Sequence, residues 1–208
     1  MRNKILKPIV FLAALVPLGL LGLDALQGHL GANPIEKVTH WTGLSTLILL
    51  LVTLSITPLR RITRVQWLIQ YRRMIGLFAF LYGCLHLTTY VWLDQFFDVH
   101  SMIKDVYKRP FITAGFTAFV LLVPLALTST KGSIRRLGKR WQRIHRLIYF
   151  STAAGVIHFI WLVKADLREP LIYATIFGGL MAIRVWFWIE KRRRSSMPAA
   201  HAVPAQAD

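Results

Sequence analysis

Six long apolar runs follow one another along the chain, separated by short segments that carry most of the charge. They cover about residues 5–23, 41–57, 74–93, 111–127, 145–163 and 171–189. Each run has roughly the length that a helix needs to cross the hydrocarbon core of a bilayer, at a rise of about 1.5 Å per residue. The pattern therefore predicts an all-α integral membrane protein, a six-helix transmembrane bundle with short loops. No internal repeat is evident in the sequence.

The first run resembles a signal peptide in its basic start and its apolar stretch, but no small-x-small cleavage site follows it. Because five more apolar runs come after it, we expect an uncleaved first membrane helix. Pro17 and Pro124 fall inside predicted helices, and membrane helices tolerate proline better than soluble helices do.

The charge of the chain changes sharply from one loop to the next. The 208 residues are 55% hydrophobic and carry a formal net charge of +17. A nucleic-acid-binding protein interleaves its charge with polar structure, whereas here apolar runs and short charged segments alternate, as membrane lipids require. If the N-terminus is cytoplasmic, the cytoplasmic side holds 20 of the 26 Lys and Arg residues and two of the nine acids. This positive-inside pattern predicts that both termini are cytoplasmic, together with residues 58–73 and 128–146.

The pattern leaves one membrane domain, residues 1–194, followed by a polar tail rich in Pro and Ala, residues 195–208, which we expect to be disordered. The single cysteine, Cys84, lies within an apolar run. Neither an internal disulfide nor a cysteine-based zinc or iron–sulfur site can therefore form, and we interpret Cys84 as a small buried apolar residue.

His86 and His158 lie deep inside two apolar runs, and each follows a glycine by three residues. Both predicted helices run from the cytoplasm outward, and each histidine lies 13 residues after a residue of the basic border, Arg73 or His145. Both histidines are therefore about 20 Å from that border, at the rise of a regular helix. Two imidazoles at one depth on parallel helices can bind a haem iron from both sides.

Gly83 and Gly155 lie one helical turn inward of the two histidines and on the same face. Because glycine has no side chain, a flat macrocycle can lie against the backbone there. The repeated Gly-x-x-His pattern thus predicts a slot for haem. Other interpretations stay open, since an intramembrane histidine can hydrogen-bond a neighbouring carbonyl and two histidines can form a proton relay.

His145 lies at the cytoplasmic border and, on an ideal helix, points about 140° away from His158. It can ligate a second haem near the inner face. It can instead hold a flavin or quinone head with Arg72, Arg73 and Arg143, because guanidinium groups bind phosphate and carboxylate. It can also be an ordinary interfacial histidine. The opposite helix has arginines and no histidine at this level, so a second bis-histidine haem lacks its partner ligand.

The other histidines lie at a border, in loops or in the tail, and we interpret them as structural or interfacial: His29, His40, His100 and His201. Near the inner end of the last run, Arg184 can extend its side chain to the lipid headgroups. Trp186 and Trp188 fit an aromatic belt at the same level.

Seven segments together resemble a known family. They are LGANPIEKVTHWTG (30–43), ITPLRR (56–61), RRMIGLF (72–78), LHLTTY (85–90), KRPFITAG (108–115), LALTSTKGSIRRLGKRWQRIH (125–145) and PLIYA (170–174). In this order they resemble the membrane haem subunit of the bacterial periplasmic methionine-sulfoxide reductase system. That family belongs to the ferric-reductase-like transmembrane superfamily, which includes the NADPH oxidases.

The resemblance implies haem b, FMN, and electron supply from the quinone pool or from a cytosolic flavin reductase. It also implies a periplasmic partner, a molybdenum (molybdopterin) methionine-sulfoxide reductase subunit that repairs oxidised proteins. The histidines that carry over are His86, His145 and His158. Ferric reductases and NADPH oxidases append a cytosolic domain for FAD and NADPH, but no Gly-rich dinucleotide fingerprint occurs here, so we expect the electrons to come from another molecule.

We therefore expect an electron-transfer subunit in the bacterial inner membrane, in which haem carries the redox chemistry. Two alternatives are a self-standing ferric or oxygen reductase and a small proton-coupled transporter. The sequence contains no nucleophile or acid–base pair that predicts a catalytic site of its own.

Overall fold

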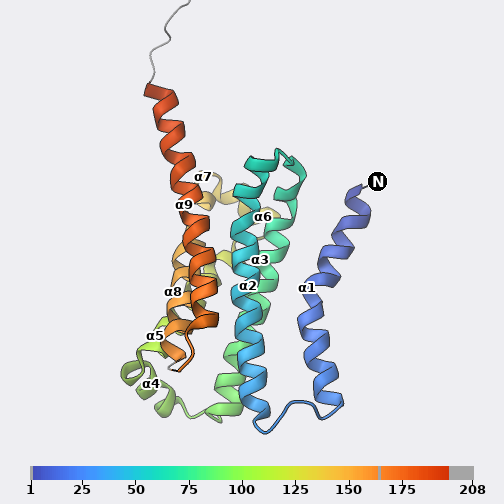
Figure 1. Cartoon of the computed structure of the whole chain (residues 1–208), viewed down its shortest axis with the longest axis vertical. Coiled ribbons are helices and arrows are strands. Elements are labelled where there is room, and N and C mark those ends of the chain that lie inside the picture. Colours follow the sequence, from blue (N-terminus) through green and yellow to red (C-terminus); the bar gives the residue numbers. More distant parts are fainter. Residues whose placement is uncertain (1, 164, 197–208) are drawn as a thin grey trace, which may run out of the picture.

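Helices form all the regular structure in the computed structural model, which describes residues 2–163 and 165–196 (Figure 1). They are α1 (Arg2–Leu26), α2 (Pro34–Thr63), the 3₁₀ helix η1 (Gln66–Tyr71), α3 (Arg72–Thr88), the π-helical turn η2 (Thr89–Asp94), α4 (Val99–Lys108), α5 (Pro110–Leu127), α6 (Lys131–Leu137), α7 (Lys139–Ile144), α8 (Leu147–Leu162) and α9 (Arg168–Ser196). The predicted all-α class is confirmed.

Each of the six apolar runs contains a helix, but among the described residues only five helices are long and apolar enough to cross a membrane by themselves. The sixth is α8, which has 16 residues and a length of about 24 Å, against a hydrocarbon core of about 30 Å. The helix of the run at 145–163 begins only at Leu147, because the chain turns at His145 and Arg146 between α7 and α8. Six complete crossings therefore stay a prediction.

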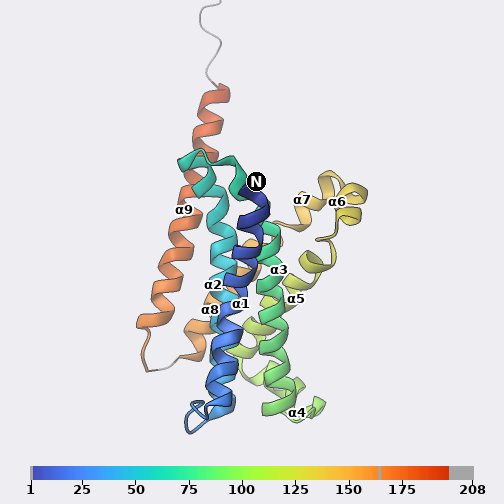
Figure 2. The same cartoon turned by 90° about the vertical axis from the view of Figure 1, so that its right-hand side faces the viewer.

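Different helices and helix ends lie at the two ends of the bundle. The start of α1, the segment around η1, α6, α7 and the last turns of α9 gather at one end, and α4 lies at the other (Figures 1 and 2). The ends of the described chain are thus on the same side, the side with most of the basic residues. That this side is cytoplasmic stays a prediction from the positive-inside rule. Helix α9 includes Ser195 and Ser196, where a disordered tail was expected; Lys164 and residues 197–208 lie outside the described residues.

Two helical hairpins form the centre of the molecule: α2 packs most extensively against α3, and α5 against α8. The hairpins are equivalent in direction, and 72 residues separate His86 from His158 and Gly83 from Gly155. The two hairpins thus place equivalent residues at equivalent positions, although the sequence as a whole showed no evident internal repeat. A central apolar cluster joins the hairpins and consists of Leu50, Leu54, Ala79, Leu122, Leu125 and Ile148.

Helix α1 packs against this centre through apolar contacts, a hydrogen bond from Trp41 to the carbonyl of Pro17, and one inserted hydroxyl. The Tyr82 side chain is fully buried, and its OH donates to the carbonyl of Ala14 and accepts from the N–H of Leu18. Those two groups are four residues apart and would otherwise bond to each other. The insertion lies beside Pro17, which interrupts the same ladder because proline has no N–H.

Arg184 connects α9 to the centre of the bundle. The sequence had suggested instead that its side chain extends to the lipid headgroups. Pro58 lies inside α2 and has no N–H, so the carbonyl of Leu54 loses its helical donor. Arg184 donates one guanidinium N–H to that carbonyl and another to the OH of Tyr149, at 2.9 Å. Its charged group thus satisfies a carbonyl that would otherwise be unpaired in an apolar environment.

Candidate functional site

The structure brings His86 of α3 and His158 of α8 together. Their ring centres are 6.1 Å apart and the ring planes make an angle of 74°. Each histidine comes from the second helix of its hairpin, and the equivalent directions of these helices place both imidazoles at the same level. The prediction that the two side chains face each other across the bundle is consistent with this geometry.

Both imidazoles are held through the same ring atom. Nδ1 of His86 lies 2.9 Å from the carbonyl oxygen of Thr39, and Nδ1 of His158 lies 2.7 Å from that of Phe111. A carbonyl only accepts hydrogen bonds, so Nδ1 is the protonated nitrogen of each neutral ring. The lone pair is then on Nε2, the form in which histidine binds metals, and a bond from the other nitrogen to a carbonyl is the usual support of a ligand histidine.

The spacing of the two rings fits one iron between them. An imidazole nitrogen binds a transition metal at about 2 Å, so two imidazoles on opposite sides of an iron have ring centres roughly 6 Å apart. The observed separation is 6.1 Å. Among the described residues, no group of three or more His, Cys, Asp or Glu side chains could hold a metal ion. Two axial ligands suit an iron whose other ligands come from a macrocycle, as in haem.

The predicted glycine slot has different surroundings from those expected. A Cβ at Gly83 would lie 3.6 Å from Phe119, and one at Gly155 would lie 3.9 Å from Leu47. These are ordinary packing distances between helices, so the role of Gly83 and Gly155 in a haem slot stays a prediction. The glycines that touch the imidazoles are Gly43 of α2 and Gly115 of α5. Local spacing did not indicate them because each lies on the other helix of its hairpin.

His145 lies at the opposite end of α8 from His158, in the turn after α7. Its ring stacks on Trp141, with 3.9 Å between the ring centres and an angle of 29°. Burial lowers the pKa of His145 below its ordinary value; a polar contact with the backbone of Trp141 raises it in part, and the nearby charge of Arg72 lowers it. The side chain is therefore neutral at neutral pH. Arg73, which follows Arg72 in the sequence, has an exposed side chain.

Buried polar atoms without a hydrogen-bond partner gather at this same end of the bundle. Among the described residues they are Thr57 Oγ1, Arg60 Nε, Tyr71 OH, His145 Nδ1 and Arg184 Nε. Arg61 and Arg72 lie within electrostatic range of Arg184. None of the ion pairs found in the described part of the chain involves these three arginines. Buried polar groups are almost always satisfied, so this end has the properties of a site completed by another, anionic molecule.

His40 lies at the outer end, as expected from its place at the start of the second apolar run. Its Nε2 is 4.0 Å from Oε2 of Glu169, and its ring lies edge-on to Phe159. The side chain is about half exposed. The structure thus places it at the rim of the bundle and not between the two facing imidazoles.

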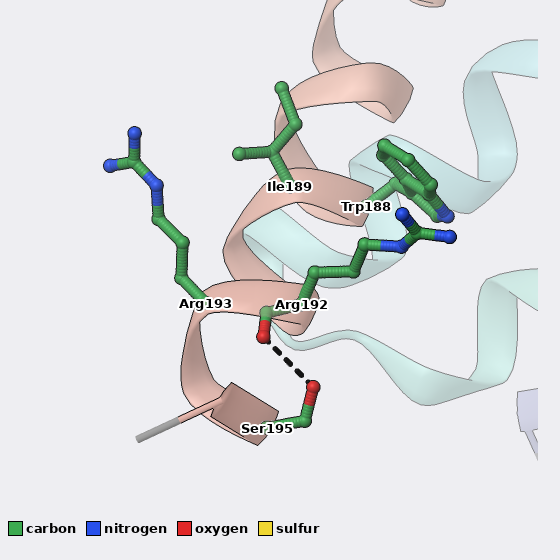
Figure 3. A pocket seen from close by; sticks show the side chains of 5 residues that line it. All are labelled: Trp188, Ile189, Arg192, Arg193 and Ser195. Atoms are coloured by element: carbon green, nitrogen blue, oxygen red, sulfur yellow. Dashed lines mark hydrogen bonds between the residues drawn. The ribbon is translucent and has the colours of Figure 1, made fainter.

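Two shallow hollows are open to the surface, and neither is lined by His86 or His158. One, of about 490 Å³, lies at the end of α9 and is lined by Trp188, Ile189, Arg192, Arg193 and Ser195 (Figure 3). The guanidinium of Arg192 lies 3.9 Å from the centre of the Trp188 ring. Exposed Trp186 and Trp188 fit the predicted aromatic belt. The second hollow, of about 540 Å³, lies beside His40 and Lys37.

Comparison with known families agrees with this geometry. The model of the ferric reductase like transmembrane component matches residues 39–156, more than half of the chain. The chain belongs to this ferric-reductase-like transmembrane family. The match includes Thr39, Gly43 and His86, and it ends two residues before His158.

Curated relatives extend the similarity over nearly the whole chain. The protein-methionine-sulfoxide reductase heme-binding subunit MsrQ of Herminiimonas arsenicoxydans is 53% identical, over 93% of this chain and 90% of the relative. The subunit of the same name from Ralstonia nicotianae is 48% identical, over 94% and 91% of the two chains. No solved structure matches the chain. These relatives confirm the family resemblance and the assignment to a multi-pass protein of the bacterial inner membrane.

Proposed function

We propose that this protein is the haem-binding membrane subunit of a protein-methionine-sulfoxide reductase system and carries electrons across the inner membrane. The observation that carries the proposal is the facing pair His86 and His158, with each Nδ1 bonded to a backbone carbonyl and each Nε2 free for a metal. The relatives support it, since they are named heme-binding subunits of this reductase.

The two hairpins would hold haem b through the imidazoles of His86 and His158. Bound haem supplies a one-electron carrier, because its iron alternates between the ferric and ferrous states. The chain's own residues do the rest: the carbonyls of Thr39 and Phe111 orient the imidazoles and make them more basic. The apolar side chains around them keep water away from the iron, which strengthens electrostatic control of its potential.

The inner end is our proposed point of electron entry. His145, Arg72 and Arg73 would bind the FMN phosphate, a quinone head or a docked flavin reductase, because guanidinium groups pair with phosphate and carboxylate. The unpaired polar atoms at this end support the proposal. An inner carrier is needed because the histidine pair lies in the outer half of the bundle.

The outer end is our proposed point of electron exit, to a periplasmic molybdopterin-containing reductase. Reduction of one methionine sulfoxide consumes two electrons and two protons and releases methionine and water. A single haem transfers one electron at a time, so the partner must accumulate two electrons before it reduces the sulfoxide. This chain would then contribute transport of electrons and no catalytic group.

Reconstitution in liposomes tests this function. The purified full chain is incorporated, an enzymatic flavin reductase or a quinol supplies electrons on the side of the basic end, and the periplasmic partner with methionine sulfoxide is added on the other. We expect haem reduction, then reoxidation only when both partner and sulfoxide are present. Rapid reduction of ferric chelates or oxygen without the partner would instead favour a self-standing reductase, and a colourless protein would favour a transporter.

A further inference from the structure

We propose that Gly43 and Gly115 are positioning residues that fix the orientation and tautomer of the two haem-ligating histidines, an inference that rests on the proposed haem function. Each glycine lies on the first helix of a hairpin and faces the histidine on the second helix. Each also lies four residues after the residue whose carbonyl that histidine bonds: Thr39 before Gly43, and Phe111 before Gly115.

Helix geometry explains why glycine is needed at this spacing. In an α-helix the carbonyl of residue i accepts from the N–H of residue i+4, and side chains lean toward the N-terminal end. The side chain of residue i+4 therefore lies beside the carbonyl of residue i and covers it. Without a side chain at Gly43, the oxygen of Thr39 keeps a lone pair open to a second donor, and the imidazole of His86 takes it.

The distances show how little space remains. A Cβ at position 43 would lie 2.9 Å from Cε1 and 3.0 Å from Nδ1 of His86. A Cβ at position 115 would lie 2.8 Å from Nδ1 and 2.9 Å from Cε1 of His158. Carbon atoms in contact are normally about 3.5–4.0 Å apart. The ring would have to move away, and its hydrogen bond to the carbonyl would lengthen or break.

The same arrangement occurs twice in the chain. The residue whose carbonyl accepts the hydrogen bond precedes its histidine by 47 residues in each pair. An offset of 72 residues separates Thr39 from Phe111, Gly43 from Gly115 and His86 from His158. Within the hairpins the same offset also relates four other pairs of identical residues: Leu49 and Leu121, Leu50 and Leu122, Phe78 and Phe150, and Gly83 and Gly155. Repetition of carbonyl, glycine and histidine together indicates one ligand-holding unit used on both sides of the iron.

The expected chemical consequence is a change at the iron. An imidazole that donates Nδ1–H to a carbonyl is more basic and stabilises the higher oxidation state of its metal. Loss of that hydrogen bond should raise the midpoint potential of the haem. A rotated ring should also change the angle between the two imidazole planes, and with it the g values of the low-spin ferric signal.

The experiment compares three single variants of the full chain: Gly43→Ala and Gly115→Ala, with Gly76→Ala as a matched control. The control adds the same methyl group to the first hairpin, where a Cβ would lie 3.7 Å from Thr53, an ordinary packing distance. We measure haem per protein, the g values and the midpoint potential. We expect Gly43→Ala and Gly115→Ala to lose at least half of the haem, or to retain it with shifted g values and a raised potential. The control should match the parent.

A stability cycle tests the contact even if a variant folds poorly. If the methyl group at position 43 clashes with the ring of His86, Gly43→Ala should lower the melting temperature in the parent and not in a His86→Ala background. The same holds for Gly115→Ala with His158→Ala. Equal cost in both backgrounds would overturn the positioning role. A haem-loaded parent in which Gly43→Ala behaves like Gly76→Ala would overturn it too, whereas a parent without haem would overturn the proposed function itself.

Discussion

At both ends of the two hairpins, equivalent residues are 72 positions apart, but only the outer end has a histidine in both hairpins. At the outer level, an offset of 72 residues relates His86 to His158, and both copies supply an imidazole. At the inner level, the same offset relates Arg73 to His145, so one copy supplies a guanidinium where the other has a ring. A structural repeat thus doubles a ligand only where both copies keep the ligating residue, and at the inner level position 73 is an arginine where position 145 is a histidine.

Hydrogen bonding separates the two ends as well. At the outer end each Nδ1 is already paired with a carbonyl, so the imidazoles are held before any metal binds. At the inner end five buried polar atoms of the described residues have no partner. Satisfied groups make a rigid, finished ligand pair, whereas unsatisfied ones mark a site that another molecule completes.

The largest expected difference is one of location, since the two ends should be on opposite sides of the membrane. In a Cys84→Ala background, Asp98→Cys beside α4 and Ser133→Cys in α6 place one thiol at each end. We expect an impermeant maleimide to label the first from the periplasm and the second from the cytoplasm. Labelling of both positions from the same side would contradict the prediction that the two ends lie on opposite sides of the membrane.

Removal of an outer ligand should have the next largest effect. His86→Ala and His158→Ala should each abolish nearly all haem binding, because the iron keeps only one protein ligand. His29→Ala and His100→Ala, which change exposed histidines, serve as controls and should bind as much haem as the parent. The haem-to-protein ratio of the purified variants measures this. His86→Ala with a full low-spin spectrum would show that the pairing is wrong.

Changes at the inner end should slow electron entry by about tenfold, roughly the effect of one lost charged contact, and leave the haem in place. Arg72→Gln should carry most of the effect because Arg72 lies near His145, whereas Arg73→Gln changes an exposed side chain. Stopped-flow reduction by quinol or a flavin reductase is compared with reduction by dithionite, which bypasses the site. Insertion is checked first, because loss of positive charge can disturb topology. Equal slowing with both donors would contradict the proposal.

His145→Ala distinguishes the possible occupants of the inner end. Loss of a second haem signal would make His145 a ligand, and loss of flavin with haem intact would make it part of a flavin site. Unchanged cofactors and unchanged rates would return it to an interfacial role.

Arg184 offers a smaller test of the connection between α9 and the inner end. Arg184→Leu leaves the Leu54 carbonyl without a donor, which should cost about 1–3 kcal/mol of stability. Pro58→Ala restores a backbone N–H to that carbonyl, so the double variant should recover much of the loss. Thermal unfolding in detergent measures both. An equal loss with and without Pro58→Ala would rule out the role of Arg184 as a substitute donor.

The smallest expected effect is a pH dependence at His145. Its pKa is lowered mainly by burial, so the folded protein binds its proton less readily than the unfolded chain does. The resulting stability is fully present above about pH 6.5, the ordinary histidine value, and is lost as the pH falls through the lower folded pKa. Melting temperatures should therefore fall less steeply on acidification in His145→Ala than in the parent, and identical slopes would contradict this.

The sequence predicted what depends on local pattern and missed what depends on contact between distant residues. Hydropathy located all six apolar helices, and helix rise placed His86 and His158 at one level. Gly43 could not be recognised, because its importance comes from a ring 43 residues away. The carbonyl of Leu54, which Pro58 leaves without its helical donor, accepts from Arg184, a residue far away in the sequence on α9.

The same reason explains the error at the inner end. The run containing His145 is apolar enough to suggest one helix, but the chain turns there and His145 stacks on Trp141 of the preceding short helix. Helix α4 was missed because its polar side chains interrupt any apolar run, although they leave an amphipathic helix at the outer end.

The most direct test is the electron paramagnetic resonance spectrum of the purified, oxidised full chain, recorded with its optical spectra before and after reduction. The account predicts a low-spin ferric haem with two imidazole ligands, a sharp optical α band on reduction, and loss of both in His86→Ala and His158→Ala. A high-spin haem, or a protein with no haem absorption, would contradict the claim that these two histidines hold a haem iron between the hairpins.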